Sequence, residues 1–162
     1  MVNVFYGVVD NEIVDEYKSI IEDLYKYRCE LGWPPGKFST RIFRITDHKI
    51  CSDVKAFLEE RLDVSLTLQG AELQVWPVGG NSVPHIHDAR GREGTDYNSL
   101  LYLNDDFTGG EFFTEQISLK PIKNMLTFFD GSSILHGVTK VEGPSHRYTI
   151  IFWWQNTKFN GK

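Results

Sequence analysis

The stretch RYTIIFWW, residues 147–154, decides the fold, because its side chains divide cleanly between two faces. Residues i and i+2 of a strand point to the same face of a sheet, so we predict a strand with two unlike faces. One face carries Arg147, Thr149, Ile151 and Trp153. The other face is apolar enough for a core and carries Tyr148, Ile150, Phe152 and Trp154.

Strand-like segments fill the rest of the C-terminal part. Val64, Leu66 and Leu68 alternate with polar residues, as do Leu73 and Val75. Further short segments of this kind lie at 98–103, 111–114, 125–129 and 132–136. The turn sequences VGGN, NDDFTGG, PIKN, FDGS and VEGPS separate them. Many short strands joined by such turns are typical of a sandwich or barrel.

Two helices are predicted before these strands. Apolar residues from Asp10 to Arg28 form a helical stripe, and a second helix begins near Thr46 or Asp47. We therefore predict an α+β, mainly β fold: a double-stranded β-helix (jelly roll) with two N-terminal flanking helices. The length of 162 residues suits a single domain, 1–162, with a helical part at 1–63 and a jelly-roll core at 64–156.

Composition narrows the class of protein. The chain is 41% hydrophobic, which is enough for a core. Its net charge of -5 argues against a protein that binds nucleic acid or an anionic membrane. The first residues, MVNVFYGVVDNE, do not resemble a signal peptide, so we expect a cytoplasmic protein. Cys29 and Cys51 do not make a disulfide framework and are expected to be buried thiols. A monomer or a small homo-oligomer is compatible with the sequence.

The stretch PHIHDARG, residues 84–91, holds candidate metal ligands. On a strand, His85 and His87 point to one face and can reach one metal ion, while Ile86 points away into the core. Asp88 points the wrong way unless a turn follows His87, so it stays a reserve candidate. Such a pair of histidines is by itself a weak signal, because most histidines are surface or core residues.

A third ligand has to come from elsewhere in the chain. His136 follows an apolar pair at a predicted strand end and is the best candidate. His48 lies at the start of the second helix and is expected to be solvated, and His146 lies in a turn.

Residues 72–155 resemble the 2-oxoglutarate and Fe(II)-dependent oxygenases, specifically the prolyl 4-hydroxylase-like branch and its small stand-alone bacterial and phage forms. The matching pieces are PHIH at 84–87, HG at 136–137 and RYT at 147–149. Between them stand NSLLYLNDDFTGGEFFTE and PIKNMLTFFDGSSILHGV, which are similar to the intervening segments of the family. The order and spacing of these motifs make the resemblance specific.

The resemblance implies cofactors and residue roles. It implies Fe(II), 2-oxoglutarate and O2, with ascorbate as an optional addition. The implied metal ligands are His85, His87 and His136. His85, His136 and Arg147 would form the catalytic set, and the cosubstrate would be bound by Tyr102, Arg147, Thr149 and Trp153. A guanidinium suits this task because its planar fork of donors matches a carboxylate.

One position departs from the family pattern, because His87 stands where the family carries Asp. Imidazole is a good ligand for iron, zinc or nickel, so His87 can ligate the metal directly. Alternatively Asp88 swings in as the carboxylate, or the position stays vacant, as in related halogenases that carry a small residue there. Because histidine is not small, we rank vacancy last and favour His87, with Asp88 as the alternative.

The resemblance predicts an enzyme that hydroxylates a prolyl or other amino-acid side chain in a peptide or protein, releasing succinate and CO2. Such a protein would act in the cytoplasm of a bacterial or phage-infected cell. Two alternatives belong to other classes: a non-redox metal- or ligand-binding jelly-roll module, and a halogenase-type variant. The Arg147 and Tyr102 matches argue against a simple metal binder, which needs no clamp for 2-oxoglutarate.

Overall fold

The computed structural model describes residues 1–32, 39–87 and 97–157. Its largest unit is an antiparallel sheet of six strands. In spatial order these are β1 (Asn3–Tyr6), β9 (Met125–Phe129), β5 (Tyr97–Tyr102), β12 (Arg147–Asn156), β3 (Leu66–Trp76) and β2 (Thr40–Arg44). The predicted strand RYTIIFWW is therefore confirmed as a central strand, paired with β3 and β5.

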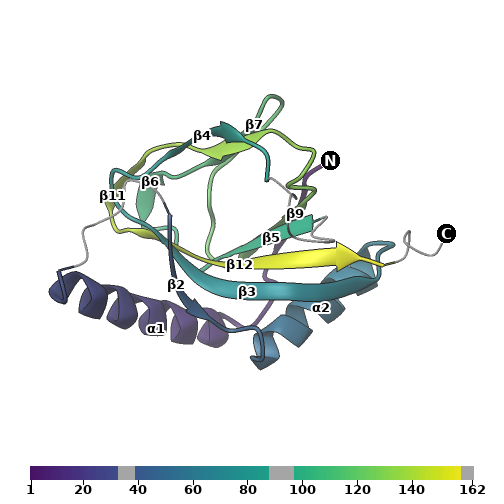
Figure 1. Cartoon of the computed structure of the whole chain (residues 1–162), viewed down its shortest axis with the longest axis horizontal. Coiled ribbons are helices and arrows are strands. Elements are labelled where there is room, and N and C mark those ends of the chain that lie inside the picture. Colours follow the sequence, from purple (N-terminus) through teal and green to yellow (C-terminus); the bar gives the residue numbers. More distant parts are fainter. Residues whose placement is uncertain (33–38, 88–96, 158–162) are drawn as a thin grey trace.

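A smaller sheet faces the large one (Figure 1). Its four strands are β4 (Ser82–His85), β10 (His136–Val138), β7 (Phe112–Thr114) and β8 (Ser118–Leu119). A separate pair is formed by β11 (Val141–Pro144) and β6 (Phe107–Gly109). Two facing antiparallel sheets with non-consecutive neighbours make the predicted jelly roll.

The two helices, α1 (Asn11–Glu30) and α2 (Lys49–Arg61), lie on the outer side of the large sheet (Figure 1). The helices bury an apolar stripe that includes Ile21 and Leu58. These side chains join one core cluster with Ile150, Phe152 and Trp154 of β12. The predicted apolar face of β12 is thus the face that the helices cover.

The N-terminal part also supplies two strands that the sequence did not predict. β1 and β2 occupy the two edges of the large sheet. They span only four and five residues, which is too short for a period to emerge from the sequence. The region 1–63 is therefore not wholly helical.

The strand predicted at 132–136 is wrong, because a turn occupies most of it. The Asp130 carboxylate accepts hydrogen bonds from the backbone and hydroxyl groups of Ser132 and Ser133, which closes the turn. The strand β10 begins only at His136.

The cysteine expectation is half right: Cys51 is buried, but Cys29 is exposed on α1. In the part of the chain that the structure describes, no helix is long and apolar enough to cross a membrane.

Candidate active site

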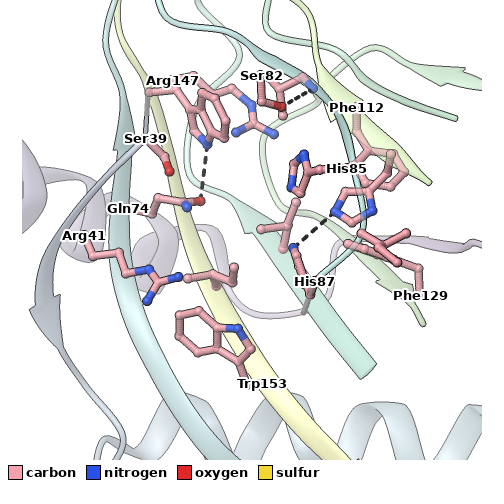
Figure 2. A pocket seen from close by; sticks show the side chains of 16 residues that line it. Ser39, Arg41, Gln74, Ser82, His85, His87, Phe112, Phe129, Arg147 and Trp153 are labelled. Carbon is pink, nitrogen blue, oxygen red and sulfur yellow. Dashed lines mark hydrogen bonds between the residues drawn. The ribbon is translucent and has the colours of Figure 1, made fainter. Parts of the chain in front are cut away.

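A cavity of about 460 Å³ lies between the two sheets. This volume is in the usual range for sites that bind small molecules. The large sheet contributes one wall, which includes Gln74, Arg147 and Trp153, and the small sheet contributes His85 and His136 (Figure 2). The face of β12 that carries Arg147 and Trp153 is the cavity face, opposite the helices.

Three histidine side chains converge on one point of this cavity. His85, His87 and His136 each offer a ring nitrogen, and these nitrogens lie within 4.8 Å of one another. The ring centroids are 4.6 Å apart for His85 and His136, and 4.7 Å apart for His87 and His136. The distance between Nε2 of His87 and Nε2 of His136 is 3.2 Å (Figure 2). Asp88, the reserve candidate, lies outside the described residues.

The hydrogen bonds of these rings leave their Nε2 atoms available to a metal. The Nδ1 atom of each ring faces an oxygen acceptor: Val83 O at 2.9 Å for His85, Asn98 Oδ1 at 2.8 Å for His87, and Ile134 O at 2.7 Å for His136. An oxygen acceptor requires the proton on Nδ1, so each Nε2 carries a lone pair. Lone pairs 3.2 Å apart repel unless a cation lies between them, and two nitrogens about 2.1 Å from one metal ion come to about that spacing.

Burial keeps the central ring neutral. Desolvation, with smaller contributions from the neighbouring rings of His87 and His85, lowers the pKa of His136 to about 4. A neutral imidazole is the form that binds a metal ion. His136 is therefore ready to act as a ligand at neutral pH.

The two histidines of PHIH reach the site by a different route from the predicted one. Strand β4 ends at His85, so strand alternation does not position His87. Instead, the backbone N–H of His87 donates to Gly131 O at 2.7 Å, which ties it to the turn after β9. Because the strand has ended, Ile86 is exposed, and the prediction that it points into the core is wrong.

Arg147 is fully buried, lines the same cavity as the histidines and is short of hydrogen-bond partners. Its Nη2 donates to the Tyr102 hydroxyl at 3.1 Å. Its Nε and Nη1 are buried and have no hydrogen-bond partner among the described residues. Burial lowers the pKa of Arg147, which means that its charge is costly to keep in this place. An unpaired buried cation at a cavity wall is a group that an anionic ligand would satisfy.

A family model matches this part of the chain. The model of the 2OG-Fe(II) oxygenase superfamily covers residues 69–155, which is more than half of the sequence.

The chain belongs to the 2OG-Fe(II) oxygenase superfamily.

Curated relatives of the oxygenase include a prolyl hydroxylase from animals. Prolyl 3-hydroxylase 2 of Rattus norvegicus and of Homo sapiens is 42% identical to this chain over 67 residues. The match covers 36% of this chain and only 9% of the length of those relatives.

Solved structures show the same fold as the oxygenase. A prolyl hydroxylase from Trichoplax adhaerens, in complex with a hypoxia inducible factor peptide fragment, matches with a TM-score of 0.74 at 17% identity, over 97% of this chain and 84% of that one. A viral collagen prolyl hydroxylase from Paramecium Bursaria Chlorella virus-1, in a 2OG complex, has a TM-score of 0.68 at 16% identity over 95% of both chains. A Pseudomonas putida prolyl-4-hydroxylase matches with a TM-score of 0.66 at 14% identity, over 95% of this chain and 91% of that one.

The remaining predicted site residues of the oxygenase differ in their surroundings. Trp153 lines the cavity. Thr149 is fully buried, and its hydroxyl donates to Gln74 Oε1 at 3.0 Å. Thr149 does not line the cavity itself, whereas Gln74 does. Gln74 also accepts a hydrogen bond from Trp76 Nε1 at 3.3 Å (Figure 2).

Sequence reasoning missed several residues that line the oxygenase cavity or contact its histidines. Gln74 carried a signal, since it alternates with Leu73 and Val75 and so has to face away from the core. Arg41 carried no signal, because its strand was not predicted. Asn98 was read only as part of a strand, yet its side chain contacts His87.

Proposed function

We propose that residues 1–162 form a single iron- and 2-oxoglutarate-dependent dioxygenase domain that hydroxylates a prolyl or other amino-acid side chain in a peptide or protein. The observation that carries this proposal is the side chain of Arg147. A fully buried guanidinium with two unpartnered nitrogens, in the cavity that also holds three convergent imidazoles, calls for an anion close to a metal. The dianion 2-oxoglutarate meets both demands.

In this proposal His85, His87 and His136 hold Fe(II) through their Nε2 atoms. When bound, Fe(II) with 2-oxoglutarate and O2 supplies the oxidising chemistry, which also yields succinate and CO2. Arg147 and the Tyr102 hydroxyl bind the far carboxylate of the cosubstrate.

Thr149, Trp153 and Phe129 shape the cosubstrate pocket and exclude water from it. Thr149 supports it through Gln74, since its hydroxyl reaches Gln74 and not the cavity. Trp153 and Phe129 wall the cavity with apolar surface, which excludes water and strengthens the contact between Arg147 and a carboxylate.

The alternatives have less support. A non-redox metal-binding module gives no reason to bury the Arg147 charge with two of its nitrogens unpartnered. A halogenase-type site needs an open position on the metal in place of the family carboxylate, but the His87 ring lies 4.7 Å from the His136 ring and faces the same point.

A peptide or protein substrate is proposed from the relatives, since proteins similar in sequence or fold are prolyl hydroxylases and one of them is bound to a peptide fragment.

The first test is spectroscopic. Anaerobic protein mixed with Fe(II) and 2-oxoglutarate is expected to show a weak visible metal-to-ligand absorption band, and Arg147→Met is expected to need far more cosubstrate to produce it. No band at saturating cosubstrate would refute the cofactor assignment. The band with metal alone would contradict the role of 2-oxoglutarate.

The second test addresses the substrate. Proline-containing peptides are incubated in air with the protein, Fe(II) and 2-oxoglutarate, with and without ascorbate. Matched peptides that carry alanine in place of proline are the control. Gain of one oxygen on the proline peptides alone, with stoichiometric succinate, is the expected result. Oxygen gain on the alanine peptides would point to another side chain as the target.

A further inference from the structure

The three candidate metal ligands are held in two different ways. His85 and His136 each place Nδ1 against the backbone carbonyl two residues earlier in the chain, at Val83 and Ile134. Those contacts are local and survive most substitutions. His87 instead places Nδ1 against a side chain, the Oδ1 of Asn98, at 2.8 Å.

Asn98 is buried behind the His87 ring. It lies on β5 and is 1% exposed. Its Nδ2 is buried without a hydrogen-bond partner among the described residues. A buried amide with an unpaired donor costs stability, so the contact of its oxygen with His87 is the useful part of this side chain.

Gly131 provides the room for this contact. A Cβ at Gly131 would collide with Asn98 Oδ1 and His87 Nδ1. Its carbonyl also accepts the backbone N–H of His87 at 2.7 Å. Ring and backbone of His87 are thus held by two neighbours that lie far from it in sequence.

We propose that Asn98 and Gly131 are positioning residues that let an imidazole serve as metal ligand at position 87, where the family pattern carries a carboxylate. Asn98 fixes the proton on Nδ1 and orients the ring, so that Nε2 faces the metal, and Gly131 keeps the space open. This inference rests on the proposed metal site and deepens it. Mutation of a residue that hydrogen-bonds to a metal ligand typically lowers metal affinity 10- to 100-fold.

The test measures metal affinity and does not depend on turnover. Co(II) is titrated into metal-free protein in competition with a chelator, and the visible Co(II) spectrum is recorded. Asn98→Leu keeps the approximate shape but removes the acceptor, so Co(II) affinity is expected to fall about 10- to 100-fold with an altered spectrum. Asn98→Asp keeps an acceptor and is expected to retain the affinity.

Matched variants separate positioning from folding. Ser99→Ala removes a buried hydroxyl from the same strand on the opposite face, where it accepts from Trp154 Nε1 at 2.8 Å, and is expected to leave Co(II) affinity unchanged. Gly131→Ala is expected to weaken Co(II) binding as Asn98→Leu does. If Asn98→Leu fails to fold, Asn98→Ala takes its place.

The outcomes distinguish this inference from the proposed function. Unchanged Co(II) affinity and spectrum in Asn98→Leu would overturn the positioning role while leaving the metal site intact. Absence of Co(II) binding by the unaltered protein would refute the metal site itself, and this inference with it.

A second inference comes from Arg41, a partly exposed residue that lines the cavity. Arg41 lies on β2, its side chain is 48% exposed, and its guanidinium lies 4.7 Å from the ring centroid of Trp153 (Figure 2). Its Nε is 3.7 Å from the Glu72 carboxylate, too far for a strong charge-assisted hydrogen bond. The guanidinium is thus oriented by an aromatic face and remains able to bind an anion.

The charged side chains that line the cavity have one sign. Among the described residues the charged lining consists of Arg41 and Arg147, with no Asp or Glu in the lining itself, although Glu72 lies 3.7 Å from Arg41 and the whole chain carries a net charge of -5. A three-imidazole site also leaves the charge of a metal ion undiminished. A cosubstrate dianion bound at Arg147 would leave Arg41 with only its long, partly exposed ion pair to Glu72.

We infer that the substrate is a peptide with a carboxylate next to the residue that is oxidised, and that Arg41 binds this carboxylate. The inference rests on the proposed function and names its substrate class. Because Arg41 is partly exposed, its contact is worth about a twofold to fivefold difference in affinity.

The test is a binding comparison on Co(II)- and 2-oxoglutarate-loaded protein, with labelled peptides followed by fluorescence anisotropy. One peptide carries Asp after proline and its match carries Asn. The Asp peptide is expected to bind about twofold to fivefold more tightly, and Arg41→Gln is expected to remove the difference. Arg44→Gln is the control, because Arg44 donates to Thr46 and does not line the cavity.

Equal or undetectable binding of the two peptides by the unaltered protein would overturn the acidic preference. A preference that persists in Arg41→Gln would overturn the role of Arg41. Either result leaves the cofactor assignment standing if the absorption band with Fe(II) and 2-oxoglutarate is present.

Discussion

Two fully buried side chains with N–H donors, on opposite faces of the large sheet, differ in how those donors are satisfied. On the helix side, Trp154 is fully buried, and its indole N–H donates to Ser99 Oγ at 2.8 Å. On the cavity side, Arg147 is equally buried, yet two of its nitrogens have no partner among the described residues. A satisfied donor adds stability, whereas an unsatisfied buried charge costs stability. One face of strand β12 thus packs in the core, and the other lines the cavity.

Two adjacent isoleucines of β12 test this division most strongly. Ile150 is fully buried among the helices, while Ile151 lines the cavity. We expect Ile150→Ala to lower the free energy of unfolding by about 2–5 kcal/mol, because it leaves a void in a dry core. Ile151→Ala should cost less than half as much, since its methyl groups face an existing cavity. Urea unfolding of both variants measures this, and equal losses would mean that the two faces pack alike.

Arg147 tests the same division through binding. Arg147→Met is expected to weaken 2-oxoglutarate binding by about 1.5–3 kcal/mol, the worth of hydrogen bonds to a charged group. The same change should leave the free energy of unfolding unchanged or raise it, because it removes a buried charge that is only partly hydrogen-bonded. Titration calorimetry and urea unfolding measure the two quantities. A loss of stability with normal cosubstrate affinity would make Arg147 a structural residue.

The pH dependence of the metal-free protein tests the burial of His136. Its pKa falls from 6.5 to about 4 on folding, so the unfolded chain binds more protons between these values. The stability contributed by the neutral ring is complete above pH 6.5 and is lost as the pH falls toward 4. We expect a lower free energy of unfolding at pH 5 than at pH 7, and a smaller difference in His136→Gln. An equal difference in both proteins would show that other groups cause it.

The smallest effect is expected outside both faces. Lys18 and Glu22 pair at 3.0 Å on α1 and are both partly exposed to solvent. Glu22→Gln should change the free energy of unfolding by at most about 0.5 kcal/mol, and less in high salt, because water screens such a pair. Thermal unfolding at two salt concentrations measures it, and a loss above 1 kcal/mol would show a hidden structural role.

Much of the fold and part of the site could be predicted from local pattern. The alternation in RYTIIFWW assigns Arg147 and Trp153 to one face and Phe152 to the other, as the structure confirms. The convergence of His136 with the PHIH histidines was also predicted, through the family spacing. Period and spacing are properties of the chain itself, so no tertiary information was needed for them.

The errors at the site share one cause. Ile86 was placed in the core because the strand was extended through His87, but β4 ends at His85 and a contact with Gly131 takes over. Asn98 and Arg41 were not assigned to the site, because no local sequence pattern indicates that they contact His87 and Trp153. Contacts between residues far apart in the chain leave no local periodicity.

The sequence by itself determined the jelly roll, the unlike faces of β12 and the presence of a site with histidine and arginine, because side-chain alternation and motif order act over a few residues at a time. Only the tertiary structure decided how the His87 ring is held, that Arg147 is buried with unpartnered nitrogens, and that Arg41 reaches the same cavity. Burial and pairing depend on what the other strands bring alongside, and that is fixed only once the two sheets have packed together.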